Sequence, residues 1–307
     1  QALQMPVSIS YVFYLIRLLP KFDYVLNHEP FPLTTLLLAV LPKANVKIFV
    51  FWHSEIIKQK LLRKLFSPFY RRMLLKSYKV FYTYPNQLKY SYFFKEFSDL
   101  SSIHVPLGVP STYISSMPIF NAIQIPSKYA LYIGRFSYYK GLEVLADSIQ
   151  DLDPSVQILI IGSGSLSENA KKIFADDDRI VFIEQFVSNN EKNWLIDNAY
   201  FLIFPSIAES EAFGIIQVEA LRSGTPIINT SLKSGVPWVS IDDITGITIE
   251  PNNSIQLSDA INKLWLDEQL VQQYSLNCIN RYDSLFNEKD MFLKISKSFE
   301  ESDNLLR

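Results

Sequence analysis

Short apolar runs alternate with amphipathic stretches along most of the chain, and this alternation predicts strands separated by helices. In the first part, the β-rich runs cover residues 23–27, 46–52, 80–83 and 103–106. Strands that are apolar throughout are typical of parallel sheets covered by helices on both faces. We therefore expect residues 1–118 to form a Rossmann-like α/β domain.

The second part has a more regular pattern of the same kind. It predicts strands at residues 129–133, 156–161, 179–183, 200–204, 227–229 and 247–249, and helices at residues 141–150, 167–175, 190–198 and from 254 onward. This is a doubly wound α/β domain, which binds ligands outside the carboxyl ends of its strands. We expect a linker at residues 115–127, a second domain at 119–286 and a C-terminal helix at 287–307 that crosses back to the first domain.

Composition supports two globular domains. The chain has 307 residues, of which 48% are hydrophobic and 20% charged, and this balance argues against disorder. Cys278 is the one cysteine, which fits a reducing compartment. We find no signal-peptide pattern and no apolar run of the roughly 20 residues that span a bilayer. We therefore expect a cytoplasmic protein.

Charge is distributed unevenly. Residues 56–95 contain ten Lys or Arg and no acid, so this segment carries +10 and the remaining residues −12. Apolar residues recur there at helical spacing, and we expect Ser67-Pro68 to end one helix and begin another. The apolar residues are Leu61, Leu62, Leu65, Phe66 and Phe69, and the bases among them are Lys58, Arg63, Lys64, Arg71 and Arg72. Such a face suits an anionic membrane, and a solvated basic face over a core helix stays open as the alternative. No nucleic-acid-binding motif accompanies the charge.

Candidate chemistry centres on residues 204–227, FPSIAESEAFGIIQVEALRSGTPI. This stretch places Glu211 before a predicted helix and Glu219 inside it, and the free N–H groups of a helix N-terminus suit an anionic ligand. In YIGRFSYYKGLEVL, we expect Gly134, Arg135 and Lys140 in the loop after the strand at 129–133. Two cations on one loop suit a diphosphate.

Two other motifs are weaker. Gly162-Ser163-Gly164 follows a predicted strand, but the pattern of a dinucleotide fingerprint fails at its third glycine, where Ser167 stands. The Asp-x-Asp pairs at Asp151 and Asp176 precede strands, and we interpret them as surface turns. Three histidines without clustered cysteines predict no metal site.

The Glu-x7-Glu spacing in ESEAFGIIQVEALRSGTPII, together with the Arg and Lys of the first loop, resembles the retaining, nucleotide-sugar-dependent glycosyltransferases of family four. These enzymes have the GT-B fold of two facing Rossmann-like domains. WHSEIIKQKLLRKLFSPFYRRMLLKSYKVFYTYPN and NTSLKSGVPWVSIDDITGITIEP are similar to the bacterial mannosyltransferases that build O-antigen and exopolysaccharide. The resemblance covers nearly the whole chain and is strongest from residue 129 to residue 251.

The resemblance implies a role for each candidate residue. Arg135 and Lys140 would stabilise the departing nucleoside diphosphate, Glu219 would accept hydrogen bonds from the ribose, and His53 would lie near the donor sugar and the acceptor. Glu211 would hold the donor sugar and its distal phosphate together with three backbone amides. Those amides belong to Ala212, Phe213 and Gly214, and the remaining residues expected at the sugar donor are Gly134, Gly162 and Gly164.

The implied reaction moves a hexose, with mannose preferred, to a glycan or lipid-linked acceptor with retained configuration and without a metal or cofactor. The sugar donor would be a nucleoside-diphosphate sugar, GDP-mannose in preference to a UDP-sugar. A lipid-linked acceptor implies peripheral association with the inner face of the cytoplasmic membrane. Cell-surface polysaccharide biosynthesis is the expected process.

The chain also departs from the family. Its first hundred residues contain no glycine, whereas the family has a first strand followed by a glycine-rich turn, so we expect an incomplete N-terminal domain. Leu107-Gly108-Val109 stands where family members often have Asn-Gly-Val. Two alternatives remain open: a nucleotide-sugar hydrolase or epimerase of the same architecture, and a non-catalytic binding subunit.

Overall fold

The chain forms two compact units, each built around one parallel sheet. The computed structural model describes residues 9–41, 46–54, 60–94, 97, 100–120 and 123–304. Unit 1 contains the described residues up to Pro106 and those from Phe292 onward, and unit 2 contains Leu107–Met291. The predicted α/β class with two parallel sheets is therefore confirmed. The predicted domain limits at residues 118 and 286 stay a prediction.

The sheet of unit 1 has the strand order β1-β2-β3-β4, and all its described pairs are parallel. Each strand corresponds to one of the predicted apolar runs. The register pairs His28 with Phe51 and Glu29 with Trp52, so β1 and β2 end level with each other. The strands are β1 (Tyr24–Glu29), β2 (Lys47–Trp52), β3 (Ser77–Tyr82) and β4 (Ser102–His104).

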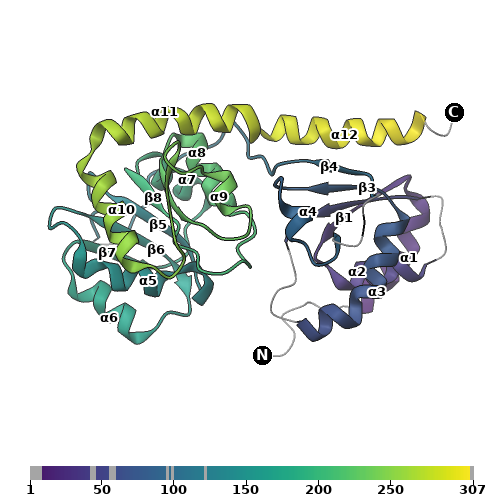
Figure 1. The fold of residues 1–307 in the computed structure, drawn as a ribbon, viewed down its shortest axis with the longest axis horizontal. Coiled ribbons are helices and arrows are strands. Elements are labelled where there is room, and N and C mark those ends of the chain that lie inside the picture. The colour runs from purple at the N-terminus through teal and green to yellow at the C-terminus, as the bar shows by residue number, and fades with distance from the viewer. Residues whose placement is uncertain are drawn as a thin grey trace. The chain divides into compact units, whose positions relative to one another are not determined.

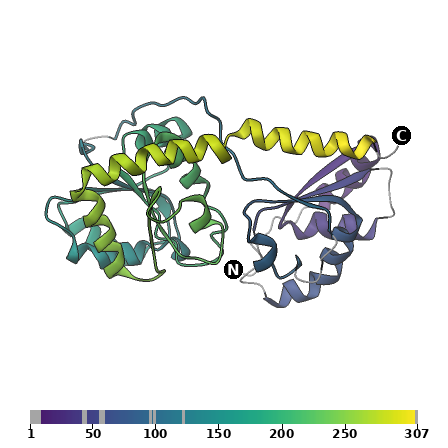
Figure 2. The same ribbon diagram turned by 45° about the horizontal axis from the view of Figure 1, so that its top comes forward.

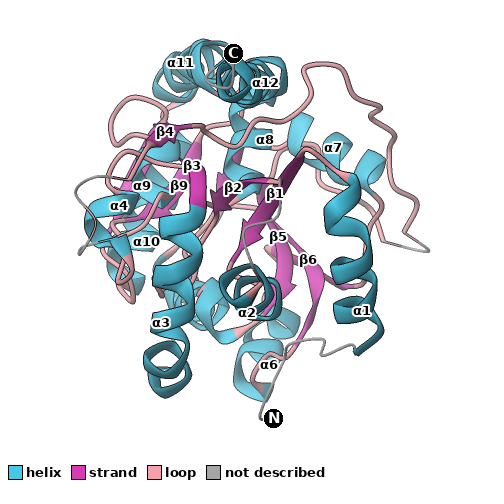
Figure 3. Ribbon diagram, turned by 90° about the vertical axis from the view of Figure 1, so that its right-hand side faces the viewer, coloured by secondary structure: helices cyan, strands magenta, loops and turns pink. Residues whose placement is uncertain are grey.

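Helices cover both faces of this sheet. Ile48, Val50 and Trp52 on β2 face a core shared with α2 and α3, whereas Phe49 points the other way, toward Phe299 of α12. Figure 3 shows α2 and α12 on opposite sides of the strands, and Figure 2 shows α12 running along the sheet. The helices of unit 1 are α1 (Ile9–Leu18), η1 (Leu19–Lys21), α2 (Pro32–Val40), α3 (Lys60–Lys76), α4 (Gln87–Tyr90) and the later part of α12 (Glu288–Asn304).

Helix α3 corrects the prediction that Ser67-Pro68 separates two helices, because it continues through Pro68. A proline inside a helix costs about 3 kcal/mol, since it removes one hydrogen bond and crowds the carbonyl four residues earlier. Pro68 lies on the exposed side, where that carbonyl, on Lys64, can be solvated. The following turns bury Tyr70, Met73 and Leu74 completely. This burial outweighs the local preference to stop.

The sheet of unit 2 has the order β10-β9-β8-β5-β6-β7, with parallel pairing throughout the described strands. The order reverses between β8 and β5, which are neighbours although three helices lie between them in sequence. Doubly wound sheets bind ligands beside such a reversal, at the carboxyl ends of the strands. The strands are β5 (Ala130–Phe136), β6 (Ile158–Gly164), β7 (Ile180–Glu184), β8 (Phe201–Ile203), β9 (Ile227–Thr230) and β10 (Gly246–Ile249).

Two layers of helices enclose this sheet (Figure 1). On one face α5 packs against α6 and α10, and on the other α8 packs against α7 and α11. Ser188 and Glu191 form a capping box that fixes the start of α7. The helices are α5 (Leu142–Ser148), α6 (Glu168–Asp176), α7 (Asn189–Asp197), α8 (Ile215–Ser223), α9 (Val236–Val239), α10 (Ser254–Leu266) and α11 (Glu268–Leu285), with the short turns η3 (Tyr138–Lys140) and η4 (Ile149–Asp151).

Strands β5 and β6 are longer than predicted, because the glycines at their ends continue the pairing. Gly134 pairs with Gly162, and Phe136 pairs with Gly164. A Cβ atom on Gly162 would lie 1.8 Å from the carbonyl oxygen of Gly134, and one on Gly164 would lie 2.2 Å from that of Phe136. Glycine therefore permits the close approach of two strands here, whereas the sequence pattern indicated a turn.

Candidate functional site

An ion pair joins the two segments that the sequence pattern singled out in unit 2. Lys140 ends the short turn η3 after β5, and Glu211 lies in the turn before α8. The Nζ atom of Lys140 is 2.5 Å from Oε2 of Glu211, and both side chains are mostly buried. The Ser206 hydroxyl donates a weaker bond to the same oxygen at 3.4 Å. A cation and a carboxylate therefore face each other at the carboxyl edge of the sheet.

The two loops that carry this pair are held together through their backbones. The N–H of Ile207 donates to the carbonyl of Tyr139 at 2.8 Å. Gly141 has a left-handed φ of 72°, and a Cβ atom there would lie 1.9 Å from the carbonyl oxygen of Pro205. Only glycine combines this conformation with this contact. The placement of Lys140 opposite Glu211 is thus built into the chain path.

The N-terminus of α8 follows directly after Glu211. Gly214 precedes the helix with a left-handed φ of 72°, and a Cβ atom on it would lie 2.6 Å from the ring of Phe204. Phe213 is buried between Trp238 and Phe286. The dipeptide Phe213-Gly214 therefore anchors the start of the helix. The first N–H groups of such a helix lack partners within it and favour anions.

Unsatisfied hydroxyl groups lie in both loops. Ser137 begins the segment that leads to Lys140, and Ser210 directly precedes Glu211. Both hydroxyl oxygens are buried and have no hydrogen-bond partner among the described residues. Since most buried polar atoms in native proteins are bonded, such atoms mark places where an external partner can bind.

Arg135 is the next-to-last residue of strand β5, and it does not lie in the following loop as predicted. The strand continues because Arg135 pairs with Ser163 of β6. Its side chain is exposed, and within the described part of the chain its guanidinium has no ion-pair or hydrogen-bond partner. Five donors of a planar cation are therefore available at the end of this strand.

Glu219 lies on the second turn of α8 and has an ion-pair partner that the sequence did not suggest. Its Oε1 atom is 2.6 Å from Nζ of Lys192 on α7, and the exposed fractions of the two side chains are 13% and 22%. Its Oε2 atom is buried without a partner among the described residues. One oxygen of this carboxylate thus has an ion-pair partner, and the other lacks a hydrogen-bond partner among the described residues.

In unit 1, two histidines meet where β1 and β2 end. Nδ1 of His28 lies 2.7 Å from Nε2 of His53, so one ring donates a hydrogen bond to the other. Burial, and next the neighbouring His28, lower the pKa of His53 to about 4, while burial lowers the pKa of His28. His104 is not part of this pair; its Nε2–H donates to the carbonyl of Thr83. The pair is therefore uncharged near neutral pH.

A buried carboxylate supports the histidine pair. Glu29 is 1% exposed, and burial raises its pKa although several groups donate hydrogen bonds to it. Among the donors are Nδ2 of Asn27 at 2.6 Å, the N–H of Phe31 at 2.6 Å and the hydroxyl of Thr35. The carbonyl of Glu29 accepts the N–H of His53 at 2.9 Å. The strand ends that carry the histidines are consequently fixed.

The predicted basic face lies on α3, with some changes. Lys64, Arg71 and Arg72 are exposed, Arg63 stacks on the ring of Tyr92 at 4.0 Å, and Lys58 lies outside the described residues. The apolar side differs from the prediction, because Phe66 and Phe69 pack against the core of unit 1. Among the described side chains of α3, the exposed leucines are Leu61, Leu65 and Leu75 at 82%, 65% and 65%, and the side chain of Leu62 is not among those described.

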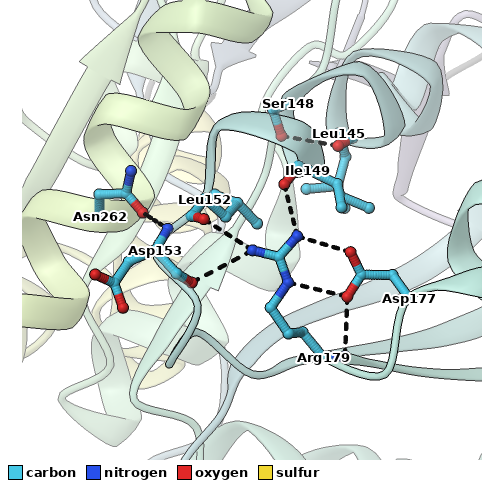
Figure 4. Close-up of polar contacts among 8 residues, drawn as sticks. All are labelled: Leu145, Ser148, Ile149, Leu152, Asp153, Asp177, Arg179 and Asn262. Carbon is cyan, nitrogen blue, oxygen red and sulfur yellow. Dashed lines mark hydrogen bonds and ion pairs between the residues drawn. The ribbon is translucent and has the colours of Figure 1, made fainter.

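The Asp-x-Asp pairs lie at the helix ends and loops before β6 and β7, at the opposite edge of the sheet from Lys140: Asp151 ends η4 and Asp176 ends α6. Arg179 organises these segments: it binds both oxygens of Asp177 and donates to the carbonyls of Ile149 and Leu152 (Figure 4). The carboxylate of Asp153 accepts bonds from Ser155. Within the described ranges, no three or more His, Cys, Asp or Glu side chains are grouped as metal ligands would be.

Comparison with known proteins identifies the family. Residues 118–281, more than half of the 307, match the family described as glycosyl transferases group 1. The chain belongs to this family. The glycosyltransferase is 29% identical over 276 residues to O-antigen chain mannosyltransferase C of Escherichia coli, across 88% of this chain and 73% of that protein. It is 28% identical over 269 residues to D-rhamnosyltransferase WbpZ of Pseudomonas aeruginosa, across 86% and 70%.

Solved structures confirm the predicted GT-B fold of this glycosyltransferase. The Anabaena protein HepE in complex with UDP aligns with a TM-score of 0.79 at 15% identity, over 95% of this chain and 82% of its own. Sucrose-phosphate synthase of Thermosynechococcus elongatus aligns with a TM-score of 0.75 at 19% identity, over 96% and 78%. At these identities the likeness concerns the fold alone.

In the structure, Lys140 and Glu211 thus form an ion pair. Glu219 lies on α8, the helix that follows Glu211, and its Oε2 atom has no partner among the described residues. The structure pairs His53 with His28 of β1, a contact that the sequence pattern did not indicate. Lys192 was missed altogether. It lies on a different helix from Glu219, and a contact between helices has no signal in a single sequence.

Proposed function

We propose that the glycosyltransferase transfers a hexose, with mannose preferred, from a nucleoside-diphosphate sugar to a hydroxyl group of a glycan or lipid-linked acceptor. The observation that carries this proposal is the pairing of Lys140 with Glu211 at the carboxyl edge of the unit 2 sheet. The proposed process is cell-surface polysaccharide biosynthesis. The names of two relatives support this choice, because D-rhamnose is 6-deoxy-D-mannose and both names therefore specify a manno-configured sugar.

Arg135 and Lys140 are proposed to bind the diphosphate and to stabilise the charge that develops on it as it leaves. Two cations match its two principal negative charges. When the diphosphate binds, Lys140 shifts its interaction from Glu211 to phosphate, and the carboxylate then accepts hydroxyl groups of the sugar. The amides of Ala212, Phe213 and Gly214 complete the site at the start of α8, and Gly134, Gly162 and Gly164 leave room at the strand ends.

The transfer is proposed to retain configuration and to need no metal. The bond from the anomeric carbon to the phosphate oxygen breaks, and the acceptor oxygen forms its bond on the same face of the sugar. The acceptor proton passes to the leaving phosphate oxygen. His53 is assigned to the acceptor and donor sugar, where an uncharged ring can accept or donate a hydrogen bond. Glu219 is assigned to the ribose, in keeping with its open buried oxygen.

Calorimetric titration with GDP, UDP and ADP tests the proposal. Guanine is the expected base, and HepE, which was solved with UDP, makes uracil the alternative. Arg135→Ala and Glu219→Ala should each weaken binding about tenfold or more, since each removes a bond to a charged group. Lys172→Ala, an exposed lysine on α6, is the control and should leave binding unchanged. If no nucleotide binds the wild-type chain, the proposal is wrong.

Product analysis separates transfer from its alternatives. With a nucleoside-diphosphate mannose and a mannose-containing acceptor, a transferase yields an α-linked product. Release of free sugar or conversion of the sugar without acceptor would instead indicate a hydrolase or an epimerase. Binding without any turnover would indicate a non-catalytic subunit.

We also propose that α3 docks on an anionic membrane at the cytoplasmic side. Positions 61, 65, 68, 72 and 75 are spaced by four and three residues, so they share one face of the helix. This stripe contains the exposed leucines and Arg72, with Lys64 and Arg71 beside it. Apolar side chains flanked by bases suit the boundary between lipid headgroups and acyl chains. No helix in the described part of the chain is long and apolar enough to cross a membrane.

A further inference from the structure

The ion pair between Lys192 and Glu219 holds two neighbouring helices in one register. Glu219 Oε1 and Lys192 Nζ are 2.6 Å apart. Two further bonds join α7 to α8: Nη2 of Arg222 donates to Oδ1 of Asn193 at 3.0 Å, and the hydroxyl of Ser223 donates to Oδ1 of Asp197 at 2.6 Å. The position of Lys192 is therefore set by helix packing and not by a flexible loop.

Because of this ion pair, the two oxygens of the Glu219 carboxylate have different environments. Oε1 accepts the bond from Lys192, whereas Oε2 is buried with no partner among the described residues. A buried carboxylate oxygen without a hydrogen-bond donor destabilises the protein, because it has lost its hydration and gained no partner. That destabilisation is removed if a ligand hydroxyl donates to Oε2.

We propose that Lys192 is a positioning residue, which holds the Glu219 carboxylate in one orientation so that Oε2 is reserved for ribose hydroxyl groups. This inference rests on the proposed function, because it requires that a nucleotide binds at α8. Without the lysine, the carboxylate has no fixed partner, and either oxygen can turn toward the ligand or toward α7. Lys192 acts through Glu219, so its effect must depend on the ribose hydroxyls.

The test is a thermodynamic cycle between the lysine and those hydroxyls. Wild type, Lys192→Met and Lys192→Arg are titrated with the nucleoside diphosphate that wild type prefers and with its 2′,3′-dideoxy counterpart. We expect Lys192→Met to bind the ribonucleotide about tenfold more weakly, the typical effect of a hydrogen bond to a charged group. Binding of the dideoxynucleotide should change less than twofold, and Lys192→Arg should bind both ligands nearly as wild type does.

Ser223→Ala is the matched control, because it removes another bond between α7 and α8 without touching Glu219. Ser223→Ala should leave the difference in affinity between the ribonucleotide and the dideoxynucleotide as it is in wild type. Thermal unfolding confirms that each variant is folded, and Lys192→Gln replaces Lys192→Met if the latter is not.

Two results overturn the inference while the proposed function stands. In the first, Lys192→Met weakens the binding of both ligands by the same factor. In the second, it weakens the binding of neither ligand, although wild type binds the ribonucleotide. Lys192 would then serve only to join the helices. If wild type binds no nucleoside diphosphate, the proposed function itself fails, and the inference fails with it.

Discussion

Lys140 and Glu211 are 71 residues apart in sequence, and their side chains lie 2.5 Å from each other with little solvent around them. A partly buried ion pair is stabilised mainly by its mutual attraction, since both charges have lost hydration. Removing either partner leaves an uncompensated charge. The pair therefore contributes to folding as well as to the proposed binding of a diphosphate, and the two contributions can be separated.

Lys140→Met should lower the free energy of unfolding by about 3 kcal/mol, because it leaves Glu211 buried and unpaired. The double variant Lys140→Met, Glu211→Leu should regain stability to within about 1 kcal/mol of wild type. Urea denaturation measures both. Nucleotide binding should be lost in the single and the double variant alike. A double variant no more stable than Lys140→Met would show that the two side chains are not coupled in solution.

Arg179 should matter for stability and not for ligand binding. Its guanidinium binds the carboxylate of Asp177 and three backbone carbonyls, so Arg179→Leu leaves several acceptors unsatisfied and should cost about 3 kcal/mol of unfolding free energy. Arg72→Leu, an exposed arginine on α3, should cost less than about 0.5 kcal/mol. Nucleotide affinity should be unchanged in both variants, because Arg179 lies at the edge where β7 begins. A loss of affinity in Arg179→Leu alone would contradict this separation.

The histidine pair predicts a specific dependence of stability on pH. Since the pKa of His53 is about 4 in the folded protein and 6.5 when unperturbed, the unfolded state binds more protons between these values. The free energy of unfolding should therefore fall as pH drops through this window, by about 3 kcal/mol in total. His53→Gln should remove this part of the pH dependence, as measured by urea denaturation at pH 7, 6, 5 and 4.

The matched control for this prediction is His104→Gln. His104 also has a lowered pKa, chiefly through burial, but it bonds to a carbonyl and not to a second histidine. His104→Gln should change the pH dependence of the free energy of unfolding less than His53→Gln does. If the free energy of unfolding depends on pH in the same way for wild type and His53→Gln from pH 7 to pH 4, the histidine pair separates on protonation without a loss of stability.

The exposed stripe on α3 should bind anionic lipid. Wild type should sediment with phosphatidylglycerol vesicles at low salt and not with phosphatidylcholine vesicles. Arg72→Ala should weaken the association about fivefold, which corresponds to about 1 kcal/mol per base, and Leu65→Asp should abolish it. Leu276→Asp on α11 is the control, since Leu276 is 66% exposed and belongs to unit 2. Equal sedimentation of Leu65→Asp and wild type would rule out α3 as the docking face.

Much of the fold follows from local patterns in the sequence. The apolar runs identify each strand, because buried parallel strands need apolar side chains on both faces. The errors have physical causes of their own. Gly134, Gly162 and Gly164 are typical of turns, yet here they let two strands approach closely. Pro68 is typical of a helix boundary, yet burial of the next turns carries α3 through it.

The candidate site is predictable in part, because Lys140, Glu211 and Glu219 belong to motifs with a fixed spacing. Contacts made by the fold are not predictable in this way. His28 and His53 meet because β1 and β2 are parallel and end in register, and Lys192 meets Glu219 because α7 packs on α8. Neither register nor helix packing is written in the spacing of residues along one chain.

The backbone bond between Ile207 and Tyr139 has a consequence for the thermodynamics of binding. Ordering a free loop around a ligand costs about 1–2 kcal/mol per residue in backbone entropy. Here the two loops are already fastened to each other, with Gly141 packed against Pro205. Most of that entropy is lost during folding, so the site is preorganised and little of the interaction with a ligand is used to order it. Inserting flexible residues into either loop would thus weaken binding although every contacting atom remained.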